Sequence, residues 1–224
     1  MSEREVLDLD VLFVGAGPAS LAGAIHLKRL LSKSGTEVSV AVLEKASEIG
    51  AHSLSGAIVD PRALRELFPD FPDTDLPFEA EVSEEHLYYL TENKKIPFPF
   101  VPPSMSHHHC FVTSLGKLTR WLGNKCENEG VDIFCGFAGT KLLYEGEQVV
   151  GVRTGDRGID KNGEKKPQFE PGADIRAKVV ILGEGTRGSL TKNLIDRHEL
   201  MQGCNPQVWA VGVKELWQMP SGTV

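Results

Sequence analysis

Residues 11–20 read VLFVGAGPAS, and the rest of the chain can be interpreted from this segment. The β-branched, apolar run Val11–Val14 predicts a strand buried on both faces. Apolar side chains then recur near helical spacing until Gly35, where we expect the helix to end. A second apolar run, Val38–Leu43, predicts another strand, which ends at Glu44. The sequence therefore predicts a strand, a tight turn, a helix and a second strand, which together form a βαβ unit.

The turn has the glycine spacing of a dinucleotide-binding fingerprint. Gly15 permits the tight turn, and Gly17 lets the backbone approach a pyrophosphate at the amino terminus of the helix. Glu44 is placed to accept hydrogen bonds from a ribose. Ser20 stands at the position of the third glycine, and we expect it to hold the helix slightly farther from the sheet. The alternative is an ordinary structural turn, because such glycine triplets are weak evidence when they stand alone.

The chain after the second strand favours FAD over NAD. The loop 49–57 consists mainly of small residues, which suits close approach of the backbone to a flat ring system. Two alternating segments, Thr140–Tyr144 and Gln148–Thr154, predict a hairpin crossover. A later strand, Ala177–Leu182, returns to the sheet and ends in Gly183-Glu184-Gly185, for which a surface turn is the alternative. We predict an α/β fold of the FAD-binding type, with a Rossmann-like βαβ sheet and a β-hairpin crossover.

The composition is that of a globular protein. The chain has 224 residues, of which 41% are hydrophobic and 25% charged, and its 24 basic and 31 acidic side chains give a net charge of −7. This length suits one large domain or a domain and a half. The acidic balance argues against nucleic-acid binding, which requires basic patches. We expect no secretory signal, transit peptide or membrane span, because the amino terminus is acidic and the longest uncharged run contains glycine and proline.

The four cysteines, Cys110, Cys126, Cys135 and Cys204, form no C-x-x-C pair. Their spacing supports neither a disulfide scaffold nor a zinc or iron–sulfur site, and we expect free thiols in a reducing compartment. Three histidines, 107–109, precede Cys110. Adjacent side chains on an extended chain point to alternate sides, so we expect a loop there and not a metal site.

Four further segments resemble one family of flavoenzymes. They are IGAHSLSGAIVDP (49–61), ELFPDFP (66–72), GIDKNGEKK (158–166) and CNPQVWAVGVKELW (204–217). Together with VLFVGAGPAS and LGEGTRG, they are similar to electron transfer flavoprotein–ubiquinone oxidoreductases over essentially all of the chain. The resemblance implies an FAD enzyme of respiratory chains. Such an enzyme takes electrons from reduced electron transfer flavoprotein and passes them to ubiquinone at a membrane surface, with FAD and a [4Fe–4S] cluster.

The resemblance also implies roles for individual residues. Gly15, Gly17, Pro18 and Ala19 would line the pyrophosphate, and Glu44 the adenosine ribose. His52–Gly56 would approach the flavin, and Glu184 and Gly185 would lie near its ribityl–phosphate region. The full set of predicted cofactor-binding residues is Gly15, Gly17, Pro18, Ala19, Ser20, Glu44, Lys45, His52, Ser53, Leu54, Ser55, Gly56, Gly183, Glu184 and Gly185. One-electron transfer needs no acid–base side chain, and we name no catalytic residue.

The family is longer than this chain, and its cluster cysteines and quinone-site residues would lie beyond Val224. We therefore expect an amino-terminal fragment, with an FAD-binding domain over 1–200 and the start of a quinone or substrate domain over 201–224. Such a fragment should bind FAD weakly or partially and reduce no quinone. The alternatives are a related FAD-dependent reductase or hydroxylase, and a catalytically silent nucleotide-binding fragment. The expected location is peripheral, on the cytoplasmic face of a bacterial inner membrane.

Two apolar segments have a structural and a functional interpretation. Leu64, Leu67, Phe68 and Phe71 could form the core-facing side of a short helix. They could instead form an apolar rim that dips into lipid, as the resemblance suggests for a monotopic protein. The pair Tyr88–Tyr89 is expected to lie partly in the core. The basic tract Lys161–Lys166 is expected at a solvated hairpin tip.

Overall fold

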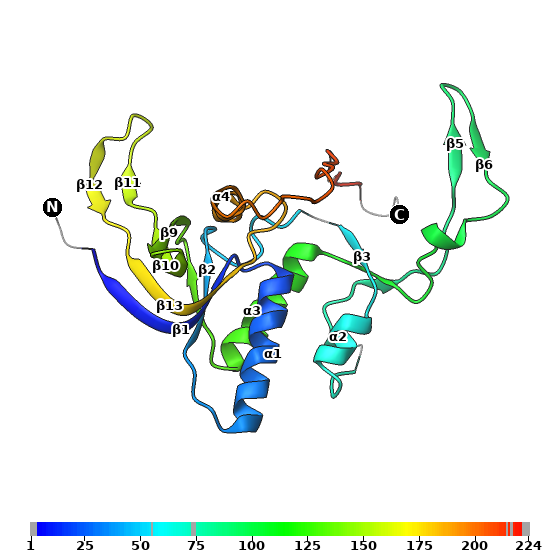
Figure 1. Ribbon diagram of the computed structural model, residues 1–224. Helices are drawn as coiled ribbons and strands as arrows, with labels where there is room; N and C mark the ends of the chain where they lie inside the picture. Colours follow the sequence, from blue (N-terminus) through cyan, green and yellow to red (C-terminus); the bar gives the residue numbers. More distant parts are fainter. Residues whose placement is uncertain (1–3, 55, 73–74, 214, 216, 221–224) are drawn as a thin grey trace. The chain divides into compact units, whose positions relative to one another are not determined.

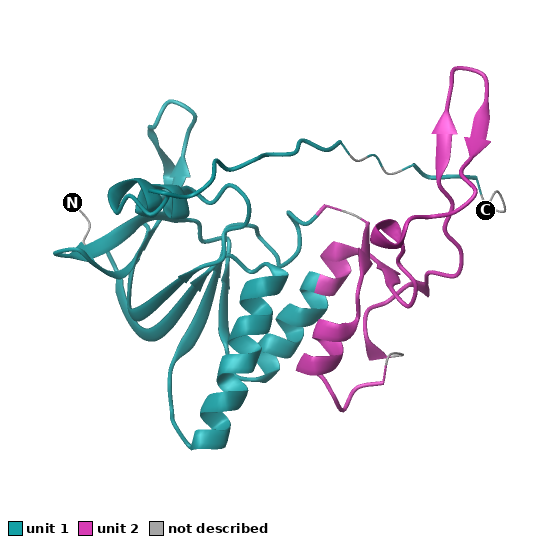
Figure 2. Cartoon of the chain, turned by 45° about the vertical axis from the view of Figure 1, so that its right-hand side comes forward, with its two compact units in different colours: residues 1–53, 119–224 teal, residues 54–118 magenta. Residues whose placement is uncertain are grey.

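The structure is a computed structural model that describes residues 4–54, 56–72, 75–213, 215 and 217–220. The chain forms two compact units, which Figure 2 colours separately. Unit 1 comprises residues 1–53 and 119–224, and unit 2 comprises residues 54–118. The sequence did not predict the separate unit 2. The predicted boundary near residue 200 stays a prediction.

The centre of unit 1 is a six-stranded sheet (Figure 1). Its strands, in spatial order, are β8 (Asp132–Cys135), β2 (Val40–Glu44), β1 (Val6–Val14), β13 (Asp174–Leu182), β10 (Gln148–Thr154) and β9 (Gly139–Glu145). The first four are parallel, and β10 and β9 continue the sheet in antiparallel pairing. The carboxyl ends of the four parallel strands therefore meet at one edge, which is where open α/β sheets bind ligands.

Helix α1 (Pro18–Ser34) begins directly after the glycine turn. Proline at its first position is preorganised for a helix and has no N–H to leave unpaired. The helix ends at Gly35, as predicted, in the left-handed conformation with φ +65°. Gly35 N–H donates to Ser32 O at 3.2 Å and Thr36 N–H to Leu31 O at 3.0 Å, which closes the last turn.

The close approach of α1 to the sheet occurs at Gly23. A Cβ on Gly23 would lie 3.3 Å from Cε1 of Phe13 on β1, so the absent side chain lets the helix rest on that ring. The predicted displacement of the helix by Ser20 stays a prediction. Ser20 is only 4% exposed, and its hydroxyl faces Gly183, where any Cβ would come within 1.9 Å of it.

The core of unit 1 lies at the sheet and explains the apolar strands of the sequence. Its fully buried members include Leu12 on β1, Leu43 on β2, Val152 on β10 and Leu190 on α4 (Ser189–Arg197). Strand β1 pairs with a parallel neighbour on each edge, and Leu12, Phe13 and Val14 are at most 5% exposed, so both edges and both faces are covered there. This is the environment that a run of consecutive apolar, β-branched residues predicts.

The remaining elements of unit 1 are a helix and a hairpin. Helix α3 (Leu115–Asn128), whose first turn belongs to unit 2, leads into β8. Strands β11 (Arg157–Ile159) and β12 (Lys165–Glu170) form a two-stranded ribbon, with Ile159 opposite Lys165. The tract Lys161–Lys166 is exposed at the end of this ribbon, which confirms the predicted hairpin tip.

Unit 2 contains short elements only. Its three-stranded sheet has the order β3 (Ala57–Val59), β7 (Phe111–Thr113) and β4 (Ala80–Glu81), and a separate hairpin consists of β5 (Tyr88–Leu90) and β6 (Lys95–Pro97). Helix α2 (Arg62–Leu67) has six residues, and a 3-10 turn covers Pro103–Met105. The rings of Phe78 and Phe111 stack at 4.2 Å between centroids.

The structure decides two of the open interpretations for unit 2. Leu64 is 8% exposed and Phe68 is 1% exposed, so the core alternative holds for both and the apolar-rim hypothesis is wrong for them. Leu67 and Phe71 are half-buried. Tyr89 is 60% exposed and Tyr88 is also exposed, so the expectation that this pair lies partly in the core is wrong. Among the described strands, β5 and β6 pair only with each other, and a two-stranded hairpin buries little of its side chains by itself.

Candidate cofactor site

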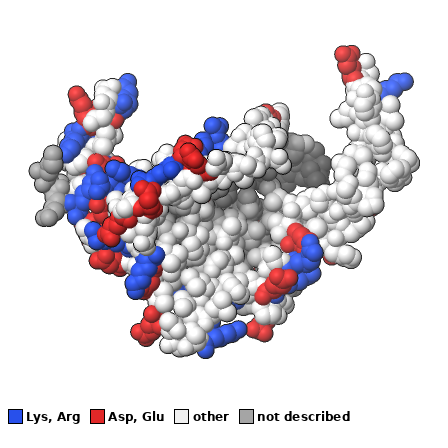
Figure 3. All heavy atoms as spheres, in the orientation of Figure 1, with Lys and Arg blue, Asp and Glu red and all other residues white. Residues whose placement is uncertain are grey.

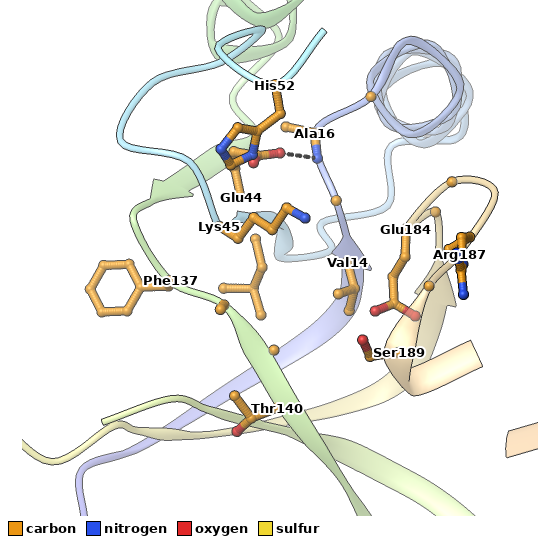
Figure 4. A pocket seen from close by; sticks show the side chains of 18 of the residues that line it. Val14, Ala16, Glu44, Lys45, His52, Phe137, Thr140, Glu184, Arg187 and Ser189 are labelled. Carbon is orange, nitrogen blue, oxygen red and sulfur yellow. Dashed lines mark hydrogen bonds between the residues drawn. The ribbon is translucent and has the colours of Figure 1, made fainter. Parts of the chain in front are cut away.

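A cavity of about 670 Å³ opens at the carboxyl edge of the parallel strands in unit 1 (Figure 4). This volume lies in the range of small-molecule and cofactor sites. The lining comes from five segments: Val14–Gly17, Leu43–Lys45, the loop with Gly50, His52 and Ser53, Phe137–Thr140, and Gly183–Ser189 without Thr186. The two predicted glycine turns therefore lie on one cavity, together with the end of β2.

The two turns are joined by close backbone contact. Gly183 N–H donates to Val14 O at 2.9 Å, and Gly15 N–H donates to Leu43 O at 2.7 Å. Gly15 has φ +98°, and a Cβ there would lie 2.6 Å from Gly183 O. Glycine is therefore required at position 15 for two reasons: its backbone conformation is left-handed, and the second turn approaches it too closely for a side chain.

Gly17, unlike Gly15, faces open space. It lines the cavity, and a Cβ on it would have no heavy atom within 4 Å. The space in front of its Cα is therefore cavity space. Gly17 is also the N-cap of α1, so the first N–H groups of that helix, at Ala19 and Ser20, have no intrahelical acceptor by helix geometry. This arrangement suits an anion.

Glu44 connects the end of β2 to the glycine turn. Oε2 accepts a hydrogen bond from Ala16 N–H at 3.0 Å, drawn in Figure 4, and Oε1 accepts one from Ala46 N–H at 2.7 Å. These bonds fix the carboxylate, and each of its oxygens has a further lone pair. Because Glu44 lines the cavity, its remaining lone pairs can accept hydroxyl donors there, and its role toward a ribose stays a prediction.

Glu184 has a structural role that the sequence analysis missed. Its Oε2 accepts hydrogen bonds from Thr191 N–H and Thr191 Oγ1, both at 2.8 Å, and Oε1 accepts one from Leu190 N–H at 3.2 Å. The carboxylate thus caps the amino terminus of α4 and complements its dipole. The available signal was the acid shortly before a helix start at Ser189.

Two cationic side chains, Lys45 and Arg187, also line the cavity, and Figure 4 shows them on different sides of it. His52 belongs to the lining as well. Both carboxylates of the cavity, Glu44 and Glu184, already accept backbone N–H groups. Lys45 and Arg187 can therefore contact an anionic group of a ligand in the cavity.

Several lining residues were not predicted from the sequence. They are Val14, Ala16, Leu43, Gly50, Phe137–Thr140, Arg187, Gly188 and Ser189. Phe137–Thr140 follow β8, the parallel neighbour of β2, and the rule that carboxyl ends share one edge could have found them. Arg187 and Gly188 lie in the quoted motif LGEGTRG, where only the first glycines and the acid were singled out.

Not all predicted site residues are at the cavity. Of the predicted loop, His52 and Ser53 line it, and Ser53 Oγ lies 3.5 Å from Thr119 Oγ1. Leu54 and Gly56 belong to unit 2, and Ser55 lies outside the described residues. Pro18, Ala19 and Ser20 form the first turn of α1 directly behind Gly17.

The cysteines show no arrangement for a metal. Within the described ranges, no three or more histidine, cysteine or acidic side chains form a group that could hold a metal ion. Burial raises the pKa of the Cys126 thiol to about 12, and burial together with the charge of Glu44 raises the pKa of the Cys135 thiol. Burial therefore disfavours the thiolate form that a metal ligand takes. In the part of the chain that is described, no helix combines the length and the apolarity needed to cross a bilayer.

No family model matches the chain, but curated relatives do. A probable electron transfer flavoprotein–ubiquinone oxidoreductase from Acinetobacter baylyi is 43% identical over 222 residues, which make up 97% of this chain and 39% of the relative. The mitochondrial electron transfer flavoprotein–ubiquinone oxidoreductase of Mus musculus is 42% identical over 217 residues, or 96% of this chain and 35% of the relative. The chain spans about two fifths of the length of these curated relatives.

Solved structures share the fold at lower identity. A geranylgeranyl bacteriochlorophyll reductase-like protein from Thermoplasma acidophilum matches with a TM-score of 0.54 at 22% identity, covering 79% of this chain and 39% of that one. A myxobacterial chondrochloren halogenase, a variant of FAD-dependent halogenases, matches with a TM-score of 0.53 at 17% identity, covering 83% and 39%. The fold is thus the Rossmann-like fold of FAD-binding flavoenzymes. By sequence, the chain is a homologue, over 97% of its length, of the amino-terminal part of electron transfer flavoprotein–ubiquinone oxidoreductases.

Proposed function

We propose that the chain binds FAD in the cavity of unit 1. We further propose that, in the whole protein, this FAD passes electrons from reduced electron transfer flavoprotein to ubiquinone. The observation that carries the first proposal is the meeting of two glycine turns and a fixed carboxylate, Glu44, at the carboxyl edge of one sheet. The names of the curated relatives support the second.

The residues of the cavity fit the parts of a dinucleotide. The open space at Gly17 and the N–H groups of the first turn of α1 would receive the pyrophosphate. The preset carboxylate of Glu44 would accept the hydroxyls of the adenosine ribose. Lys45 and Arg187 would offset the negative charge of the phosphates. These residues bind and orient the cofactor.

Bound FAD would supply the redox chemistry, and no side chain of the chain need transfer a proton. The [4Fe–4S] cluster implied for the whole protein is proposed to use ligands other than the four cysteines of this chain. Burial raises the pKa of the Cys126 and Cys135 thiols, which disfavours the thiolate form of a cluster ligand and supports this assignment. The chain would therefore contribute the flavin end of the electron path.

Titration of the purified chain with FAD, FMN and NAD tests the first proposal. We expect FAD to bind most tightly, because it alone presents an adenosine ribose to Glu44 and a flavin to the rest of the cavity. Binding is measured by flavin fluorescence and by displacement for NAD. A chain that binds NAD and not FAD, or neither, would show that the assignment is wrong.

Ubiquinone is a lipid-soluble substrate, so the proposed function requires contact with a membrane surface. We propose the β5–β6 hairpin for this contact, in place of the segment around Phe68. Leu90 and Phe100 are 69% and 68% exposed, and Phe98, whose N–H donates to Leu87 O, is also exposed. Figure 3 shows this hairpin largely uncharged below its tip. Apolar side chains below a charged tip suit the headgroup region of a bilayer.

Changing Leu90, Phe98 and Phe100 together to serine should abolish flotation of the chain with phosphatidylcholine vesicles. Each large apolar side chain contributes roughly 1.5–3 kcal/mol when fully buried. Loss of three such side chains should therefore lower the affinity for the vesicles by more than about a hundredfold. A matched control changes Val6, Leu30 and Val179, which are exposed in unit 1, to serine and should float as before. Equal flotation of the two triple variants would contradict the proposal.

A further inference from the structure

Arg157 contacts the cavity wall from outside the dinucleotide motif. It is the first residue of β11, and its side chain is exposed. Its guanidinium carbon lies 3.9 Å from the centroid of the Phe137 ring, and Nη2 donates to Gly136 O at 2.8 Å. One side chain thus holds both a ring and a backbone carbonyl of the segment after β8.

That segment forms the cavity wall beside Glu44. Phe137 N–H donates to Glu44 O at 2.9 Å, and Gly136 N–H donates to Ala46 O at 2.6 Å, so the pairing of β2 with β8 continues past the strand ends. On its other side, Ala138 O accepts a hydrogen bond from Gly155 N–H at 2.8 Å. The wall is therefore held by β2 from one side and by the start of the β11–β12 hairpin from the other.

The order of the strands assigns this wall to one end of the ligand. The pyrophosphate site follows β1, the ribose acceptor Glu44 ends β2, and β8 lies on the far side of β2 from β1. A dinucleotide that extends in this direction brings its adenine past the ribose to the wall around Phe137. The opposite end, toward β13 and the Gly183 turn, is left for the flavin.

The chemistry of Arg157 suits this role. Gly136 has φ +77°, so its carbonyl is presented by a turn and not by the sheet ladder. A guanidinium is planar, and it can stack on an aromatic face while it donates to an acceptor in its own plane. The ammonium group of lysine is a point donor that lacks the planar face.

We propose that Arg157 is a positioning residue for the adenosine half of FAD. It holds residues 136–138 in the orientation that receives adenine, and it thereby favours FAD over flavins without adenosine. The inference rests on the proposed FAD binding and adds a determinant of cofactor choice that lies in the β11–β12 hairpin. Arg157 acts through the wall and does not itself touch the reacting ring.

The test compares dissociation constants for FAD, AMP and FMN in the unchanged chain, Arg157→Ala and Arg157→Lys. In Arg157→Ala, we expect binding of FAD and AMP to weaken by the same factor, about tenfold, because both present adenosine to the wall. Binding of FMN should stay unchanged, because FMN has no adenosine. The unfolding midpoint without ligand should also stay unchanged, because Arg157 is exposed. Arg157→Lys keeps a donor but loses the planar stack. Its affinity for FAD and AMP should therefore lie between that of the unchanged chain and that of Arg157→Ala. Lys161→Ala, at the exposed hairpin tip, is the control for the lost charge.

Each alternative result has a distinct meaning. Equal FAD and AMP affinity in Arg157→Ala and the unchanged chain would overturn the inference and leave the proposed function standing. Equal weakening of FAD, AMP and FMN, with a lowered unfolding midpoint, would assign Arg157 a merely structural role and also overturn it. Failure of the unchanged chain to bind either FAD or AMP would overturn the proposed function, and this inference with it.

Discussion

Gly17→Val is expected to leave the purified chain without FAD. The valine side chain would occupy cavity space directly in front of the α1 amino terminus, where a Cβ meets no protein atom within 4 Å. The pyrophosphate needs that space for its approach to the backbone. Because the space is open in the protein itself, the fold should tolerate valine. The amount of flavin that denaturation releases from the purified variant should fall below about a hundredth of the amount from the unchanged chain, because a steric block allows no partial binding.

The control for this result is Gly212→Val. Gly212 also has open space at its Cα, lies away from the cavity and shows no positive φ. Its flavin content and its unfolding midpoint should match those of the unchanged chain. Flavin retention by Gly17→Val at the level of Gly212→Val would remove the β1–α1 turn from the cofactor site.

Gly183→Ala should destabilise the chain, and adding Ser20→Gly to that variant should restore its stability. The new Cβ would lie 1.9 Å from Ser20 Oγ and 3.3 Å from Ser20 Cβ, in a region where Ser20 is buried. Overpacking of this kind costs about 1–3 kcal/mol, or about 2–12 °C in the unfolding midpoint for a domain of this size. With glycine at position 20, the nearest remaining atom is Val14 O at 3.6 Å, an ordinary contact.

The four chains of this double-mutant cycle are compared by thermal unfolding and by FAD binding. Ser20→Gly alone should change the midpoint by less than Gly183→Ala alone, because it removes atoms and creates no clash. The hydroxyl of Ser20 has no hydrogen-bond partner among the described residues, so its loss removes no bond. Additive effects of the two changes would mean that the residues are not in contact.

The βαβ unit could be predicted because its residues have local causes. The strand Val11–Val14, the helix end at Gly35 and the acid at Glu44 each follow from side-chain pattern or from backbone freedom within a few residues. Elements of this kind are specified by neighbours in sequence, so periodicity and turn chemistry suffice.

The features that the sequence left open, missed or got wrong depend on contacts between distant segments. The sequence left the burial of Phe68 open, and its expectation for Tyr89 was wrong. Both outcomes depend on which elements of unit 2 cover the segment, and a pattern of apolar residues does not specify that. Arg157 reaches Gly136 across 21 positions and through a hairpin. The pairing of Ser20 with Gly183 joins the two glycine turns, and only the register of β1 with β13 brings them together.

The pairing of β1 with β13 also has a consequence for biosynthesis. Val14 lies opposite Leu182, so the central strand acquires its second neighbour only after about 170 further residues have been made. At about 5–20 residues per second, a ribosome needs on the order of ten seconds or more for that stretch. Throughout this time an apolar strand, buried near Phe13 and Val14 in the finished protein, has one open edge that can pair with other chains. The nascent chain is therefore open to edge-to-edge pairing during synthesis, and the sheet closes late because its central contact joins residues far apart in the sequence.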